Sequence, residues 1–123
     1  MDLIQYNLIN DIYISELDKE EINGYSKILN IIFDQTFGTD FNFEEVKIIK
    51  NFTINDIILK RLHDEQHKIL TAKYNSDIIA FIEINGIDCI PYYFVKTEYF
   101  PLKIEIGKKL MQYYLLKSKW ILN

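Results

Sequence analysis

Two histidines and one cysteine are the residues best suited to metal or nucleophilic chemistry. His63 and His67 stand at i and i+4 in the stretch HDEQH, a spacing that can chelate zinc on a helix. A metalloprotease motif needs Glu at the position of Asp64, and the sequence has only 2 histidines. A nucleophilic cysteine needs a partner base, and neither histidine is near Cys89 in sequence. We therefore expect Cys89 to be a small buried residue of a strand. We therefore predict no metal site and interpret HDEQH as a polar helix end before a strand.

A glycine and several lysines suggest an anion site. Gly107, Lys108 and Lys109 begin an expected amphipathic helix, which follows a loop over residues 96–106. Free N–H groups and the dipole at a helix start bind anions, and Lys103 adds positive charge. The same residues suit a plain connection between a strand and a helix. The residues alone leave both interpretations open.

Aromatic residues are frequent in the second half, where they include Phe81, Tyr92, Tyr93, Phe94, Tyr99 and Phe100. Aromatic side chains on a sheet can stack on the bases of single-stranded nucleic acid. The acidic N-terminal half argues against that partner, because residues 1–65 carry 13 acids and 6 bases, a net charge of −7. Residues 66–123 carry 5 acids and 8 bases, a net +3. We expect no nucleic acid, and a C-terminal half that can meet an anionic ligand.

The N-terminal elements that would support these residues are a strand and helices. Residues 3–9 are expected to form a short strand. The stretch Ser15-Glu16-Leu17-Asp18 has the form of a capping box and predicts a helix over 16–35. A second capping-box form, Thr53 to Asp56, predicts a helix over 54–66.

The pattern changes to strands within residues 68–95. Turn signals at Asn75-Ser76-Asp77 and at Asn85-Gly86 separate apolar runs, which predicts a three-stranded antiparallel meander. A C-terminal helix follows. The sequence is therefore predicted to form one α+β domain over residues 1–123, with an N-terminal strand and helices, the meander and a last helix.

The composition is typical of a soluble globular protein, with 49% hydrophobic and 26% charged residues. The single Cys89 excludes an internal disulfide framework and points to a reducing compartment. No apolar run approaches the ~20 residues of a membrane span. The start of the chain lacks the basic region of a signal peptide. We expect a cytoplasmic protein without a membrane segment.

The stretch from residue 57 to about residue 117 resembles the GNAT family of acyl-CoA N-acyltransferases. Residues 62–84, LHDEQHKILTAKYNSDIIAFIEI, are similar to the family's helix followed by its second and third strands. Residues 92–115, YYFVKTEYFPLKIEIGKKLMQYYL, are similar to the fourth strand, the pyrophosphate loop and the following helix. The resemblance implies a GNAT-like fold, acetyl-CoA as co-substrate and an amine as acceptor.

The resemblance also implies roles for single residues. The backbone of Phe94 and Val95 would hydrogen-bond the pantetheine arm. The pyrophosphate would be held by the segment 103–108, with these cofactor-binding residues: Lys103, Ile106, Gly107 and Lys108. Glu83 and Glu98 are the nearest acidic candidates for the base that takes a proton from the amine.

The sequence departs from the family in its loop and its length. The family's loop pattern is Gln/Arg-x-x-Gly-x-Gly/Ala. Here Leu102 stands at the Gln/Arg position and Glu105 at the first Gly, so only Gly107 matches. Family members continue into a fifth strand, so this chain resembles the N-terminal part of the fold. We expect an acetyltransferase, either active or degenerate, that self-associates through its fourth-strand edge. The alternatives are a non-catalytic α+β interaction module and a subunit completed by a partner.

Overall fold

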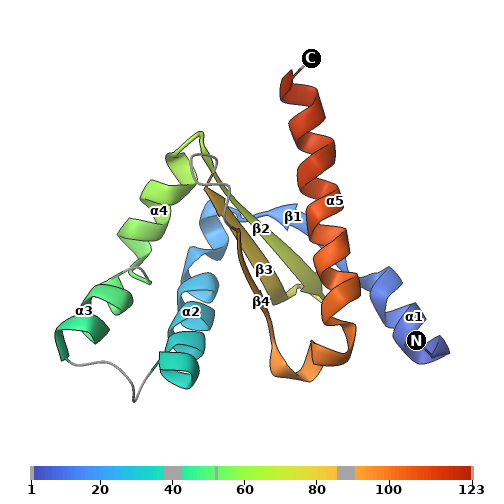
Figure 1. Cartoon of the computed structure of the whole chain (residues 1–123), viewed down its shortest axis with the longest axis horizontal. Helices are drawn as coiled ribbons and strands as arrows, with labels where there is room; N and C mark the ends of the chain where they lie inside the picture. The colour runs from blue at the N-terminus through green and yellow to red at the C-terminus, as the bar shows by residue number, and fades with distance from the viewer. Residues whose placement is uncertain (1, 38–42, 52, 86–90, 123) are drawn as a thin grey trace. The chain divides into compact units, whose positions relative to one another are not determined.

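The computed structural model (Figure 1) describes most of the chain, namely residues 2–37, 43–51, 53–85 and 91–122. These residues divide into two compact units. Residues 1–16 and 68–123 make up the sheet unit, and residues 17–67 make up the helical unit. The α+β class predicted from the sequence is confirmed by the order of helices and strands along the chain.

One antiparallel sheet forms the centre of the sheet unit. Its strand order is β1 (Tyr13–Glu16), β2 (His67–Tyr74), β3 (Asp77–Asn85) and β4 (Pro91–Val95). Asn75 and Ser76 make the turn between β2 and β3, with positive φ values of 51° and 71° that suit a type I′ turn. The predicted meander is confirmed, and β1 adds a fourth strand beside β2. The predicted turn at Asn85-Gly86 lies partly outside the described residues.

The N-terminal residues form a helix, α1 (Leu3–Asp11), where the sequence predicted a strand over 3–9. The cause is a capping box between Asp2 and Gln5. The Asp2 Oδ1 accepts a hydrogen bond from the Gln5 N–H at 2.8 Å, and the Gln5 Oε1 accepts one from the Asp2 N–H at 3.2 Å. The first strand begins after α1, at Tyr13.

The C-terminal helix begins four residues earlier than the sequence predicted. A 3-10 turn, η2 (Thr97–Leu102), follows β4 and leads directly into α5 (Lys103–Leu122). The expected loop to Ile106 is therefore helical, and Gly107 lies in the second turn of α5 rather than at its start. Pro101 precedes α5, where a missing N–H interrupts no bond within that helix.

A buried stripe explains this early start. Leu102, Ile106 and Leu110 recur every four residues and are at most 2% exposed. They pack in one core with buried residues of α1, of its C-cap and of the strands, namely Ile9, Ile12, Leu70, Ala72, Ile79, Ala80, Ile82, Ile84 and Val95. Figure 1 shows the chain turning after β4 and α5 running back along the sheet.

The helical unit begins with a short 3-10 turn and continues with three helices: η1 (Lys19–Glu21), α2 (Ile22–Phe37), α3 (Phe43–Asn51) and α4 (Asn55–His63). The capping box that starts it is formed by Asp18 and Glu21, not by Ser15 and Asp18 as predicted. The Asp18 side chain accepts from the Glu20 N–H at 3.2 Å, and Glu21 Oε1 accepts from the Asp18 N–H at 2.9 Å. The cap therefore lies one turn later than predicted.

Two further expectations on α4 are corrected. Its N-cap is Ile54, which makes no side-chain cap bond, so Thr53 does not cap this helix. His63 ends α4 and His67 begins β2, so the two histidines do not share a helix face. Among the described residues no helix is both long and apolar enough to cross a membrane.

Candidate functional site

The outer edge of β4 presents backbone groups that bond to no other strand among the described residues. The Lys96 N–H donates to the Ile79 carbonyl at 2.8 Å, which makes this a hydrogen-bonded pair of the ladder. Bonded and non-bonded pairs alternate in an antiparallel ladder. The backbone of Phe94 therefore faces β3, whereas Tyr93 and Val95 turn their N–H and C=O groups outward.

Of the two residues expected to bind pantetheine, Val95 has its backbone groups on the outer edge and Phe94 does not. The Phe94 side chain stacks on Phe81 across the strands, with ring centroids 5.6 Å apart. Tyr93 shares the outward direction of Val95, and its residue type alone does not indicate this. Strand register decides this assignment, and register is not visible in residue types.

The four residues expected to hold a pyrophosphate all lie on α5, namely Lys103, Ile106, Gly107 and Lys108. Lys103 and Lys108 are exposed, whereas Ile106 is completely buried in the core. The Lys103 ammonium lies 5.7 Å from the centroid of the Phe100 ring. The structure brings the two lysines to the first turns of one helix and assigns Ile106 to packing.

The backbone amides at the start of α5 differ in their availability. The Lys103 N–H donates to the Phe100 carbonyl of η2. From Ile106 onward the N–H groups bond within the helix, each to the carbonyl four residues earlier. Ile104 and Glu105 carry the other two amides of the first turn of α5.

Lys109 does not add to the charge at this end of α5. Its ammonium donates to the Ile9 carbonyl at 2.6 Å and to the Ile12 carbonyl at 2.7 Å, at the C-terminal end of α1. A cation at the C-terminus of a helix interacts favourably with the helix dipole. Desolvation lowers the pKa of Lys109, and the nearby Asp11 carboxylate opposes this shift. Lys109 therefore ties α1 to α5.

Tyr93 links β4 to α5. Its O–H donates to the Lys103 carbonyl at 2.5 Å. A Cβ at Gly107 would lie 3.2 Å from Tyr93 Cε2 and 3.3 Å from its Cζ and oxygen. Burial raises the pKa of Tyr93 to about 12; a hydrogen bond from the Gly107 backbone lowers it and the Glu105 charge raises it further. The phenol is therefore held against the first two turns of α5.

The structure does not bring the two candidate bases together. Glu83 lies on β3 opposite Tyr92, near the start of β4, and is only 1% exposed. Glu98 lies beyond the other end of β4, in the first turn of η2, and is exposed. Glu83 also shares a sheet face with Phe81 and Phe94, opposite to the face of Tyr93.

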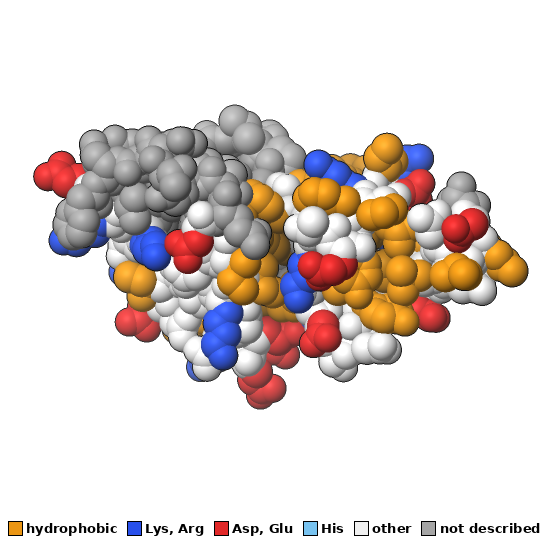
Figure 2. All heavy atoms as spheres, turned by 90° about the horizontal axis from the view of Figure 1, so that it is seen from below, with side chains coloured by type: hydrophobic (Ala, Val, Ile, Leu, Met, Phe, Trp, Pro, Cys, Tyr) orange, Lys and Arg blue, Asp and Glu red, His pale blue; other side chains and the backbone are white. Residues whose placement is uncertain are grey.

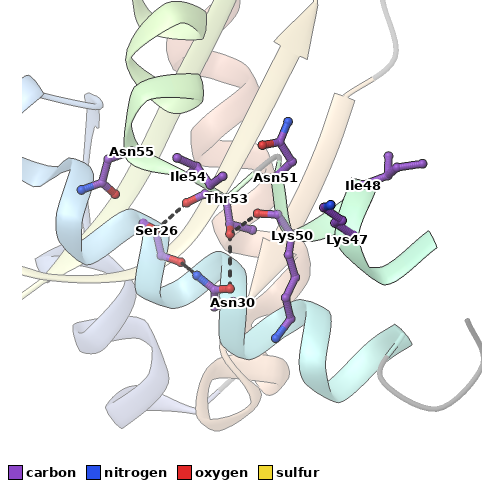
Figure 3. A pocket seen from close by; sticks show the side chains of 9 residues that line it. All are labelled: Ser26, Asn30, Lys47, Ile48, Lys50, Asn51, Thr53, Ile54 and Asn55. Carbon is purple, nitrogen blue, oxygen red and sulfur yellow. Dashed lines mark hydrogen bonds between the residues drawn. The ribbon is translucent and has the colours of Figure 1, made fainter. Parts of the chain in front are cut away.

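A separate groove of about 1110 Å³ lies in the helical unit (Figure 3), lined by Ser26, Asn30, Lys47, Ile48, Lys50, Asn51, Thr53, Ile54 and Asn55. Three of its polar side chains, those of Ser26, Asn30 and Thr53, form a hydrogen-bond network. Ser26 Oγ donates to the Thr53 carbonyl at 2.5 Å, and Asn30 Nδ2 to the Ser26 carbonyl at 3.0 Å. Thr53 Oγ1 lies 2.7 Å from the Lys50 carbonyl and 3.2 Å from Asn30 Oδ1. This network joins α2 to the connection between α3 and α4, which explains why Thr53 is not a helix cap.

Apolar side chains also reach the surface, as Figure 2 shows for one face of the molecule. In the sheet unit the large exposed ones come from α1, β1, η2 and α5: Leu3, Ile4, Tyr6, Tyr13, Phe100, Ile104, Met111, Leu115 and Leu116. Scattered exposed apolar residues are normal on soluble proteins. They carry no chemistry of their own.

Comparison with known proteins supports the fold. The sequence matches no protein-family model and no curated protein. The structure is similar to PaiA N-acetyltransferase from Thermoplasma acidophilum, solved in complex with coenzyme A, with a TM-score of 0.63 and 22% identity over 89% of this chain and 70% of that one. It is also similar to ribosomal-protein-alanine N-acetyltransferase from Brucella melitensis biovar Abortus 2308, with a TM-score of 0.54 and 11% identity over 88% of this chain and 72% of that one. The GNAT-like fold expected from the resemblance is thereby confirmed.

Proposed function

We propose that this chain is a GNAT-like N-acetyltransferase that uses acetyl-CoA to acetylate an amine. One observation carries the proposal: the outer edge of β4 offers the N–H and C=O groups of Tyr93 and Val95 directly before a helix. The fold adds support, because a similar solved structure is an N-acetyltransferase in complex with coenzyme A.

In this proposal the pantetheine arm lies along β4 and bonds to the outward backbone groups of Val95 and Tyr93. The diphosphate lies at the start of α5, near the amides of Ile104 and Glu105. The exposed ammonium groups of Lys103 and Lys108 lie within two turns of those amides and supply positive charge. Gly107 contributes by admitting the Tyr93 ring, and Ile106 by holding α5 on the sheet.

The reaction joins the amine nitrogen to the thioester carbonyl carbon and breaks the bond from that carbon to sulfur. The ammonium form of the acceptor must first lose a proton, and the thiolate that leaves must gain one. Glu98 and Glu83 are the proposed candidates for the base. Glu98 is exposed and reachable from solvent, whereas Glu83 is buried in the sheet.

Calorimetric titration with acetyl-CoA tests the binding step. We expect measurable heat and a rise in thermal unfolding temperature, and neither effect at millimolar ligand would refute the proposal. Val95→Pro removes an outward N–H without breaking the ladder, so we expect affinity to fall about 5- to 10-fold, the value of one hydrogen bond. Tyr6→Phe, at an exposed position on α1, is the matched control.

Acetyl transfer is tested by following thiol release with a panel of amines. A catalytic base of this kind contributes typically about 10²–10⁴-fold, so Gln at its position should lower kcat by that factor. We expect this for either Glu98→Gln or Glu83→Gln. Equal and unchanged kcat in both folded variants would remove both residues from the mechanism.

One observation favours a second function, that of a non-catalytic module, either a degenerate acyltransferase-like domain or an α+β interaction module. The segment that resembles the pyrophosphate loop is helical, and Glu105 places a carboxylate next to the amides proposed for the diphosphate. Acetyl-CoA binding without turnover on any amine would support this module.

Two further expectations stay predictions. Self-association through the β4 edge follows from its outward backbone groups, since unpaired strand edges tend to pair with other chains. Light scattering at high protein concentration tests it, and a strictly monomeric profile would contradict it. A cytoplasmic location rests on the lone Cys89.

A further inference from the structure

We infer that Tyr93 is a positioning residue for the diphosphate end of an acyl-CoA. Its phenol holds the first turns of α5 against β4. The outward backbone groups of β4 and the start of α5 are thereby kept in one fixed arrangement, in which both can contact the same ligand. The inference rests on the proposed function. It adds a residue that neither the sequence motif nor the resemblance selected.

The first support is that Tyr93 belongs to both parts of the proposed site. Its backbone N–H and C=O point outward from the β4 edge, beside those of Val95. Its side chain extends from the sheet face that α5 covers, where it packs against the core. Its O–H ends at the Lys103 carbonyl, 2.5 Å away, at the first residue of α5.

The second support is that the Tyr93 phenol contacts α5 at two residues one turn apart. The Lys103 carbonyl accepts from the Tyr93 O–H, and the Tyr93 oxygen lies beside Gly107, 3.3 Å from the position that a Cβ would take there. In an α-helix the residue-107 N–H and the residue-103 carbonyl would bond each other. The phenol therefore sits at the bond that joins the first turn of α5 to the second.

The third support is the lack of a side chain at Gly107. No described glycine has a positive φ, so the backbone at Gly107 does not require this residue. A Cβ there would lie 3.2 to 3.3 Å from three atoms of Tyr93, closer than ordinary van der Waals contact. Gly107, the one position that fits the family's loop pattern, is therefore explained here by the Tyr93 ring.

These contacts have a consequence for binding. The amides of Ile104 and Glu105 and the side chain of Lys103 are attached to the turn that Tyr93 holds. A ligand group that contacts this turn benefits from a preorganised geometry, whereas a group that contacts only β4 does not. Loss of the phenol O–H should therefore weaken the diphosphate contacts and leave the pantetheine contacts intact.

The test compares two probes that share the pantetheine arm: CoA, which carries the diphosphate and the 3′-phosphoadenosine attached to it, and pantetheine, which lacks both. Tyr93→Phe removes one hydrogen bond and keeps the ring. We expect its Kd for CoA to rise about 5- to 10-fold, as for one lost hydrogen bond, and its Kd for pantetheine to change less than about 2-fold. Tyr6→Phe, which removes an exposed phenol on α1, should leave both Kd values unchanged.

Other outcomes overturn the inference in distinguishable ways. If Tyr93→Phe weakens both probes equally, Tyr93 supports the fold in general and does not position the diphosphate end. If it weakens neither, the O–H has no role in binding. If the wild-type chain binds neither probe, the proposed function itself is refuted and the role of Tyr93 with it.

Discussion

Replacement of Gly107 by alanine tests the contact between β4 and α5 most directly. Alanine in a helix interior is normally more stable than glycine, by roughly 0.5–1 kcal/mol. At Gly107 the new methyl group would lie 3.2 Å from Tyr93 Cε2, and the phenol is bonded to the Lys103 carbonyl. Overpacking of this kind costs about 1–3 kcal/mol. We expect Gly107→Ala to lower the free energy of unfolding by about 1 kcal/mol, the difference of these two terms.

Gly24 provides the matched control, because it is also a helical glycine. An added Cβ at Gly24 in α2 would meet no atom within 4 Å. Gly24→Ala should therefore raise the free energy of unfolding by roughly 0.5–1 kcal/mol. The two substitutions are chemically identical, so opposite signs would isolate the effect of the Tyr93 ring.

A double-mutant cycle with Tyr93→Phe completes the test. The phenylalanine ring has no bond to Lys103 and can shift by the few tenths of an ångström that the methyl group needs. We expect Gly107→Ala to be neutral or stabilising in this background, a coupling of about 1 kcal/mol. Urea unfolding followed by circular dichroism measures all four variants, with unchanged m-values as a check. The reasoning is refuted if Gly107→Ala stabilises the wild type as Gly24→Ala does, or if its effect is the same in both backgrounds.

Three smaller predictions concern stability. Lys109→Gln should lower the free energy of unfolding by about 1–2 kcal/mol and speed amide exchange in α1, because the hydrogen bonds from the Lys109 ammonium to the C-terminal end of α1 are lost. Lys108→Gln, at an exposed position on the same helix, should change it little. The Tyr93 pKa is raised to about 12, which means that the folded state favours the neutral phenol. The contribution of this phenol to the free energy of unfolding is therefore complete below pH 10 and is lost as pH rises toward 12. Thermal melts should show this alkaline loss, about 1 kcal/mol after screening of the half-buried ring, and Tyr93→Phe should lack it. Ser76→Gly should raise the melting temperature, since Ser76 has φ of 71° and glycine adopts positive φ more easily; no rise would contradict the turn assignment.

The sequence predicted the parts of the fold that short-range signals determine. The meander was predicted because turn residues such as Asn75 and Ser76 separate runs of strand-forming residues. Helix α1 also has a local signal, the capping box of Asp2 and Gln5, but the imperfect alternation over residues 3–9 favours a strand. Pro101 and Gly107 predict a later start for α5, whereas the helix begins at Lys103 because Leu102 and Ile106 are buried at a spacing of four residues.

The site was less predictable because its contacts depend on register and on pairs far apart in sequence. Which of Phe94 and Val95 faces outward follows from the pairing of β4 with β3, and a shift of one residue would reverse it. The contact of Tyr93 with Gly107 depends on that register and on which side of α5 faces the sheet. Lys109 bonds to Ile9, 100 residues away, so its charge could not be assigned to α1 from the sequence.

The two proposed uses of the β4 edge exclude each other, which yields a last prediction. A second chain that pairs with β4 and a pantetheine arm would both bond to the outward N–H and C=O groups of Tyr93 and Val95. A ligand that binds only the free edge stabilises the unpaired chain by mass action. Acetyl-CoA should therefore lower the mass measured by light scattering, and Val95→Pro should weaken both self-association and binding. A ligand-independent oligomer that still binds acetyl-CoA would show that the two partners use different surfaces.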